Sequence, residues 1–104
     1  MAQFDVYENP NAETNQAVPY LLDIQSDLLD NLATRVVVPL VDARVVGKPI
    51  QHLNPGFHID NSRVVMSTAE LAGISTGALG KKIGSLKDRR DEIVAALDFL
   101  ITGF

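Results

Sequence analysis

The sequence contains no cysteine, and this absence removes a whole set of chemistries. Without a thiol the chain forms no disulfide framework, no zinc–thiolate site and no cysteine nucleophile. Residues 1–10 also lack the basic residues and the apolar stretch of a secretory signal, and no apolar run approaches the length that a bilayer requires. We therefore expect a soluble, cytoplasmic protein.

Positive charge is scarce as well. Nine Lys and Arg residues stand against thirteen Asp and Glu residues, which gives a formal net charge of −4. Proteins that hold nucleic acid by themselves use Lys and Arg to neutralise phosphates, so direct nucleic-acid binding is not expected. The length of 104 residues and the apolar content of 46% predict a single domain over residues 1–104 with one core.

Alternating and β-branched segments predict a mostly β fold. We expect short strands at residues 4–7 and 19–25, and two or more strands within residues 35–46. Pro39 has no N–H for a ladder hydrogen bond, which indicates an edge strand or a bulge. A hairpin is predicted to turn at residues 60–62.

The remaining segments before the C-terminus are predicted to be irregular. Residues 9–17 are polar and form a long loop, and residues 26–31 form a turn around an apolar pair, Leu28 and Leu29. The glycine-rich residues 69–84 are interpreted as a loop with a possible short strand or helical turn.

One helix is expected from about Leu86 to Thr102. Ser85 and Asp88 fit a capping box at its start, and Gly103 fits a left-handed cap at its end. A spacing of 100° per residue places Ile93, Val94, Leu97, Leu100 and Ile101 on the buried face, and Asp91, Ala95, Asp98, Phe99 and Thr102 on the opposite face. Phe99 on that opposite face is then covered by a second protomer, by a partner, or by a concave sheet or a loop of the same chain that wraps the helix end.

Sites for metals and phosphates are not indicated. A metal site needs three or four ligands held together, and the only trio on offer is His52, His58 and Asp60. We interpret the two histidines as ordinary surface or half-buried residues, and expect no metal and no cofactor. Residues 77–82 superficially resemble a phosphate-binding loop, but Ser75 occupies the position of its first glycine and Lys82 the position of its Ser or Thr.

Catalytic constellations are not indicated either. The chain has no nucleophile-elbow motif around a serine. Asp23, Asp27 and Asp30 lie close together in the sequence, and we interpret them as a solvated rim rather than as a pair that shares a proton.

Several segments together resemble one family. Residues 3–7 read Gln-Phe-x-Val-Tyr, residues 24–30 read IQSDLLD, and residues 35–40 read Arg-x-Val-x-Pro-Leu. A C-terminal helix with glycine second from last follows. In these segments the chain resembles the CcdB toxins of bacterial toxin–antitoxin systems, and the resemblance spans essentially the whole chain.

The resemblance implies a fold, an activity and partners. The fold is mostly β with one C-terminal α-helix: a small Src-homology-type barrel of the CcdB/MazF kind, with a hairpin wing, as a homodimer. The toxin is not an enzyme; it binds the A subunit of DNA gyrase and traps gyrase on cleaved DNA. A cognate antitoxin neutralises it with a disordered tail, and the complex of the two represses its own operon, so nucleic acid is contacted only through that complex.

The family's contact residues carry over to particular positions. The gyrase-binding surface falls on Leu28, Leu29, Asp98, Ile101, Thr102, Gly103 and Phe104. The family ends in Trp-Gly-Ile, whereas this chain ends in Thr-Gly-Phe and contains no tryptophan. Threonine cannot stack as an indole does, so we expect Phe104 or Phe99 to serve as the aromatic anchor. The polar loop supplies the expected antitoxin contacts Glu8, Asn9, Asn11 and Glu13.

Two other functions fit the same architecture. The related barrel toxins include endoribonucleases, whose chemistry needs acid and base groups in a cationic groove; Arg35 and His58 are the residues to test for it. The chain is alternatively a family member that binds an antitoxin without being toxic.

Overall fold

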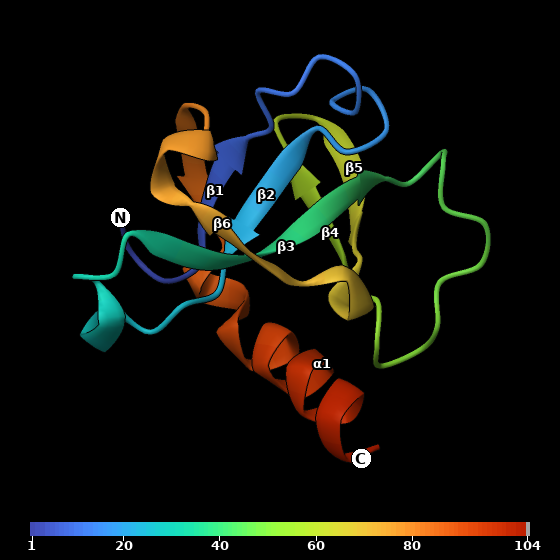
Figure 1. Ribbon diagram of the computed structural model, residues 1–104. Helices are drawn as coiled ribbons and strands as arrows, with labels where there is room; N and C mark the ends of the chain where they lie inside the picture. The colour runs from blue at the N-terminus through green and yellow to red at the C-terminus, as the bar shows by residue number, and fades with distance from the viewer. Residues whose placement is uncertain (104) are drawn as a thin grey trace.

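Seven antiparallel strands and one C-terminal α-helix make up the computed structural model, which describes residues 1–103 (Figure 1). The strands are β1 (Asp5–Glu8), β2 (Tyr20–Asp23), β3 (Thr34–Asp42), β4 (Gly56–Ile59), β5 (Ser62–Met66), β6 (Ala72–Ser75) and β7 (Lys82–Ser85). The helices are α1 (Arg90–Thr102) and the short 3₁₀ helices η1 (Asp27–Leu29), η2 (Thr68–Glu70), η3 (Thr76–Ala78) and η4 (Lys87–Arg89). This confirms the predicted mostly β fold with a terminal helix. Within residues 1–103, no helix is both long enough and apolar enough to cross a membrane.

The sheet is strongly curved and is organised around β3. Its strand order is β4-β5-β3-β2-β1-β7, with β6 also paired to β3. One edge of β3 pairs with β2, while the other edge is shared between β6 at residues 34–37 and β5 at residues 40–42. The expectation of two or more strands in residues 35–46 was wrong, because one nine-residue strand ends at Asp42. The chain turns there, and the Val45 N–H donates to the Asp42 carbonyl.

The prediction for Pro39 was also wrong. Pro39 lies inside the central strand, opposite Leu21 of β2, and not at an edge of the sheet. Its carbonyl accepts from the Ser67 N–H, so its ring nitrogen faces the same side, away from β2. On that side Pro39 lies between the part of β3 that pairs with β6, residues 34–37, and the part that pairs with β5, residues 40–42. The missing N–H therefore falls where no strand requires it.

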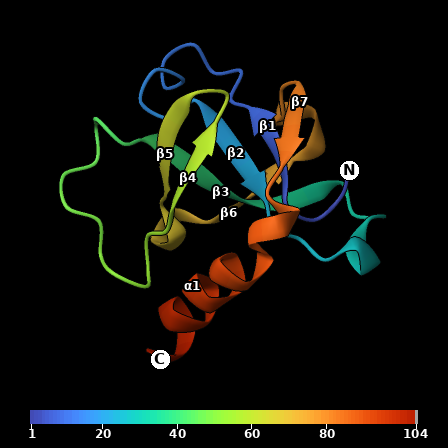
Figure 2. The ribbon, with the colours of Figure 1, turned by 180° about the vertical axis from the view of Figure 1, so that it is seen from behind.

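The core fills the inside of the curved sheet. The register aligns Val6, Leu22 and Val38 across β1, β2 and β3, and all three are fully buried. Helix α1 closes one end of the sheet (Figure 2), where Ile93 and Ala96 are fully buried. The other core residues are Phe4, Leu40, Phe57, Ile59, Val64, Met66 and Leu86.

The β4–β5 hairpin is confirmed. Asp60 and Asn61 connect its strands with positive φ angles of 48° and 68°, a conformation that Asp and Asn tolerate better than most residues.

Residues 69–84 contain more structure than a loop: the two strands β6 and β7 and the 3₁₀ helix η3 lie within them. Gly80, between η3 and β7, meets the backbone of Glu8 so closely that a Cβ there would lie 2.5 Å from the Glu8 carbonyl oxygen. Its own N–H donates to that oxygen at 3.0 Å.

The start of the terminal helix differs from the prediction. The Ser85 hydroxyl accepts from the Lys87 N–H rather than completing a capping box with Asp88. The chain first forms η4 (Lys87–Arg89), and α1 begins at Arg90. A 3₁₀ turn satisfies the first free amides by its own i to i+3 bonds, as in the bond from the Arg89 N–H to the Leu86 carbonyl.

The predicted buried face of α1 was only partly right. Ile93 is buried and Val94 and Leu97 pack on the core, but Ile101 is exposed and the unpredicted Ala96 is buried. The reason is that the last turn projects beyond the sheet, so its apolar side chain has no core to meet (Figure 1).

Candidate functional site

The free end of α1 is the first candidate surface. Ile101 keeps 79% of its surface exposed, although Leu97, one turn earlier, packs on the core. Gly103 ends the helix with a φ of +79°, which confirms the predicted left-handed cap. An apolar side chain is thus held at the end of a rigid, capped helix.

Polar groups surround Ile101 at this helix end. Asp98 is exposed, and the Thr102 hydroxyl donates to the Asp98 carbonyl at 2.7 Å. Phe104 lies outside the described residues, so its role as an aromatic anchor stays a prediction. Asp98, Ile101, Thr102 and Gly103 lie together over the last turn, and their role in binding gyrase stays a prediction.

Phe99 is half-buried against the loop that joins β3 to β4. Its ring lies 6.2 Å from the ring of His52, centroid to centroid, at an interplanar angle of 55°. Such a tilted pair is a favourable aromatic arrangement. A loop of the same chain therefore covers part of Phe99, which was one of the three arrangements expected for it.

The η1 turn is the second candidate surface. Leu28 is 93% exposed and Leu29 is half exposed, and none of the three η1 residues is buried. The Ser26 hydroxyl accepts from the Leu28 N–H, and Asp27 accepts from the Gln3 N–H at 2.8 Å. Hydrogen bonds, rather than burial, hold this apolar turn in place.

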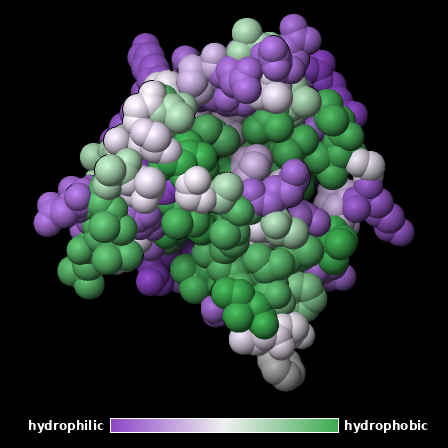
Figure 3. Space-filling view, viewed as in Figure 1, coloured by the Kyte–Doolittle hydropathy of each residue, from purple (hydrophilic) through white to green (hydrophobic). Residues whose placement is uncertain are grey.

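The two surfaces lie apart in the molecule. In both ribbon views η1 and the free end of α1 occupy separate corners (Figures 1 and 2). Between them, the space-filling view shows apolar side chains gathered over β6 and α1 (Figure 3), where Leu71 is also exposed. Those predicted gyrase-binding residues that the structure describes therefore form two separate clusters.

The polar loop of residues 9–17 lies at the far end of the molecule from α1 in both views (Figures 1 and 2). The Asn9 side chain donates to the Val18 carbonyl and accepts from the Asn11 N–H, and Asn11 accepts from the Glu13 N–H. These two asparagines shape the loop itself. Glu8 and Glu13 are exposed, so the loop presents carboxylates outward.

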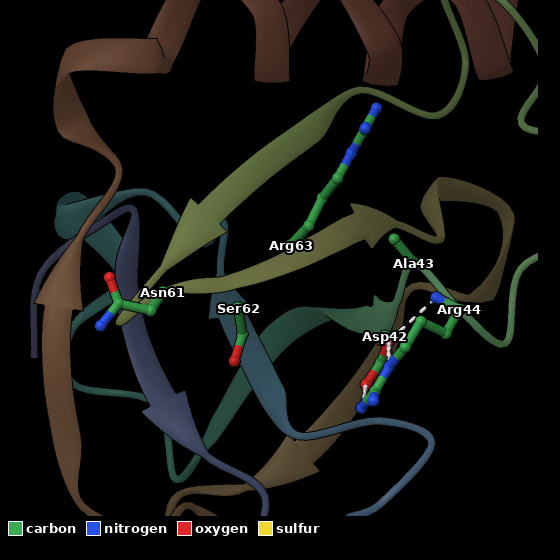
Figure 4. Close-up of a pocket in the computed structure, with 6 residues that line it drawn as sticks. All are labelled: Asp42, Ala43, Arg44, Asn61, Ser62 and Arg63. Carbon is green, nitrogen blue, oxygen red and sulfur yellow. Dashed lines mark hydrogen bonds and ion pairs between the residues drawn. The ribbon is translucent and has the colours of Figure 1, made fainter.

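A hollow of about 490 Å³ lies between the end of β3 and the β4–β5 hairpin, lined by Asp42, Ala43, Arg44, Asn61, Ser62 and Arg63 (Figure 4). Arg44 folds onto Asp42 with an ion pair of 2.7 Å, and its hydrogen bonds lower the pKa of Asp42 to about 2. Arg63 points away from that pair. His58 lies directly across from Arg63 in the hairpin, so the two exposed side chains share one face.

Within residues 1–103 no group of three or more His, Asp or Glu side chains is arranged to hold a metal ion. His52, in the loop between β3 and β4, contacts Phe99 of α1, whereas His58 lies on strand β4.

A buried polar network was missed in the sequence. The register puts Asp5, Tyr7, Asp23 and Arg35 on the face of β1, β2 and β3 opposite the apolar core. Arg35 is 1% exposed and lies 2.7 Å from the Asp23 carboxylate, which is fully buried. The interpretation of Asp23 as part of a solvated rim was therefore wrong, because a buried guanidinium supplies its partner.

The same network alters proton affinities. Burial raises the pKa of Asp23, while the hydrogen bond from Arg35 opposes that rise. Burial, with the nearby Asp5 and Asp23 charges, raises the pKa of Tyr7 to about 12. The sequence signal that would have located this network is the spacing of Asp5 and Tyr7, two residues apart on β1, together with a charged residue on each of the next two strands.

Comparisons with known proteins agree with this architecture. A solved structure described as an endoribonuclease in complex with its cognate antitoxin, from Mycobacterial species, superposes with a TM-score of 0.75. The match covers 97% of this chain and 94% of that chain at 12% identity, which shows a shared fold. The family model for the CcdB protein matches residues 3–103. Because that match spans nearly all of the sequence, the chain belongs to the CcdB family.

Proposed function

We propose that this protein is the toxin of a toxin–antitoxin pair, and that it binds the A subunit of DNA gyrase and traps gyrase on cleaved DNA. Membership of the CcdB family supports the proposal. The observation that carries it is Ile101, an apolar side chain 79% exposed on a capped helix end.

The energetics favour a partner at that helix end. Burying an isoleucine side chain fully is worth about 1.5–3 kcal/mol. The cap holds Ile101 in place beforehand, so little conformational entropy is lost when a partner covers it. Leu28, 93% exposed on η1, offers the same gain at the second cluster.

Phe104 is the aromatic anchor in this proposal. His52 already covers part of Phe99, which supports a role for Phe99 in holding the helix end against its neighbouring loop. Phe104 follows the cap residue Gly103 and takes the position of the family's last apolar residue.

The active form is a homodimer in this proposal. The apolar surface over β6 and α1 (Figure 3) supports it. Leu71, which directly precedes β6, and Ala72 on β6 are both exposed. A twofold dimer would present each contact cluster twice, which suits a partner with its own twofold axis. Sedimentation of Leu71→Asp beside the unchanged protein tests this contact, and an unaltered dimer would exclude it.

A cognate antitoxin neutralises the toxin in this proposal. The exposed carboxylates of Glu8 and Glu13 suit a basic antitoxin segment at the polar loop. Because that loop and α1 lie at opposite ends of the molecule (Figure 1), one antitoxin segment must run along the surface to reach both. The longest extent of the molecule is 35 Å, so an extended segment of more than about ten residues is needed to cover that length.

The deciding experiment is a cleavage-trapping assay with purified gyrase and plasmid DNA. The unchanged protein should accumulate linear DNA once gyrase is denatured, whereas Ile101→Ser and Leu28→Ser should accumulate much less. Val45→Ser is the matched control, since Val45 is an exposed apolar residue in the loop after β3. No linear DNA at any dose of the unchanged protein would exclude gyrase as the target.

A second candidate is endoribonuclease activity. The exposed pair of His58 and Arg63 supports it, because a histidine can move a proton beside a guanidinium that binds phosphate. Arg35 does not suit that role, since its guanidinium is buried against Asp23. RNA cleavage by the purified protein that is lost in His58→Ala would favour this candidate over gyrase binding.

A further inference from the structure

Arg35 makes contacts in two directions at once. Its Nε and one terminal nitrogen lie 2.9 and 2.7 Å from the buried Asp23 carboxylate. Its other terminal nitrogen donates to the Asp30 carboxylate at 3.1 Å. The Asp30 side chain is exposed and directly follows η1, so one guanidinium joins the interior to the apolar turn.

Gln25 makes a parallel connection. Its side-chain nitrogen donates to the Leu29 carbonyl at 3.0 Å, and its side-chain oxygen accepts from the Val36 N–H. The Asp23 carboxylate in turn accepts from the Gln25 N–H. Two buried polar side chains, one on β3 and one two residues after the end of β2, thus hold a turn that buries no side chain of its own.

A buried ion pair contributes little net stability compared with apolar residues of the same size, because desolvation offsets the attraction. Holding a particular geometry is the better-supported use of such a pair. Here the geometry at stake is that of Leu28 and Leu29, neither of which is buried.

We propose that Arg35, through Asp30 and beside Gln25, is a positioning residue that orders the η1 turn, so that Leu28 and Leu29 meet a protein partner already in place. This inference rests on the proposed gyrase contact. An apolar pair that is ordered before contact loses less entropy on binding, and the affinity of the partner rises accordingly.

The test is Asp30→Ala, which removes the surface end of the link and leaves the Arg35–Asp23 pair intact. The reporters are the Leu29, Asp30 and Leu32 amides, whose hydrogen bonds to Ser26, Asp27 and Leu29 close the turn. Their hydrogen exchange should accelerate about fivefold, and affinity for the purified gyrase A subunit should fall by about the same factor.

Two further variants separate positioning from general stability. Asp30→Asn keeps an acceptor oxygen for Arg35. Its turn-amide exchange rates and its gyrase affinity should therefore stay close to those of the unchanged protein. Glu92→Ala breaks the exposed Arg89–Glu92 pair far along the chain and should change neither the turn amides nor the affinity.

Unchanged exchange of the turn amides in Asp30→Ala would overturn the inference. The inference would also be overturned if Asp30→Ala accelerated exchange but left gyrase affinity unchanged, while Leu28→Ala weakened binding. If Leu28→Ala does not weaken binding, the proposed gyrase contact fails at this turn, while accelerated exchange in Asp30→Ala would still support the ordering role of Arg35.

Discussion

The rings of His52 and Phe99 lie 6.2 Å apart, and this contact joins the loop between β3 and β4 to the last turns of α1. His52 reaches Phe99 with a positive φ of 68°, an uncommon backbone conformation for a histidine. A loop therefore supports the helix beyond Leu97, the last of its side chains that packs on the core.

Replacing His52 by alanine should lower the free energy of unfolding by about 0.5–1.5 kcal/mol, because the ring pair is lost and Phe99 gains exposure to water. Urea denaturation followed by circular dichroism measures the change. His58→Ala, on the exposed face of β4, should stay within about 0.5 kcal/mol of the unchanged protein. Equal losses in the two variants would contradict a specific role for the ring contact.

Gly80→Ala should destabilise the protein by about 1–3 kcal/mol. The added Cβ would lie 2.5 Å from the Glu8 carbonyl oxygen, and both partners of this clash are held by backbone hydrogen bonds. Thermal unfolding provides the measurement. Gly47→Ala is the control, since no atom lies within 4 Å of a Cβ at that position; a similar loss there would show that the effect is not steric.

Arg35→Met should lower the free energy of unfolding by about 3–5 kcal/mol, because it leaves the Asp23 carboxylate buried without its partner. The double variant Arg35→Met with Asp23→Leu should recover most of that loss, since no buried charge remains. Chemical denaturation of the two variants and of Asp23→Leu alone completes the cycle. Additive losses would mean that the two side chains are not energetically coupled.

Stability should fall as the pH rises from about 10 to about 12. The folded state holds the Tyr7 proton with a pKa of about 12, whereas the unfolded chain releases it near 10. Over that window the unfolded state binds fewer protons, so rising pH favours unfolding, by up to about 1.4 kcal/mol per pH unit for this one group.

Absorbance of tyrosinate near 295 nm follows this titration directly, because the chain has only two tyrosines. Tyr7→Phe should remove the late-titrating component and flatten the loss of stability between those pH values. An unchanged high-pH titration in Tyr7→Phe would contradict the assignment of the late component to Tyr7.

Local patterns in the sequence were enough to predict β1, β2, the β4–β5 hairpin and the terminal helix. Each of them depends on alternation, on turn residues such as Asp60 and Asn61, or on a helix cap such as Gly103. The length of β3 was not predicted, because which segments pair with it depends on contacts distant in the sequence.

The candidate site, too, was predicted only in part from the sequence. The exposure of Leu28 follows from its place in a polar turn, and the family resemblance pointed to it. Helical periodicity wrongly placed Ile101 on the buried face, since it does not show where the sheet beneath a helix ends, whereas the family resemblance pointed to Ile101 as a contact residue. The burial of Asp23 was missed too, because its partner Arg35 is twelve positions away on the next strand.

Pro39 has a further consequence for strand alignment. If β6 slid two residues along β3 toward Leu40, one of its carbonyls would face a ring nitrogen with no proton to give. A slip of β5 in the other direction would meet the same obstacle. One imino acid in the central strand thus penalises the sliding of β5 and β6 toward each other along β3.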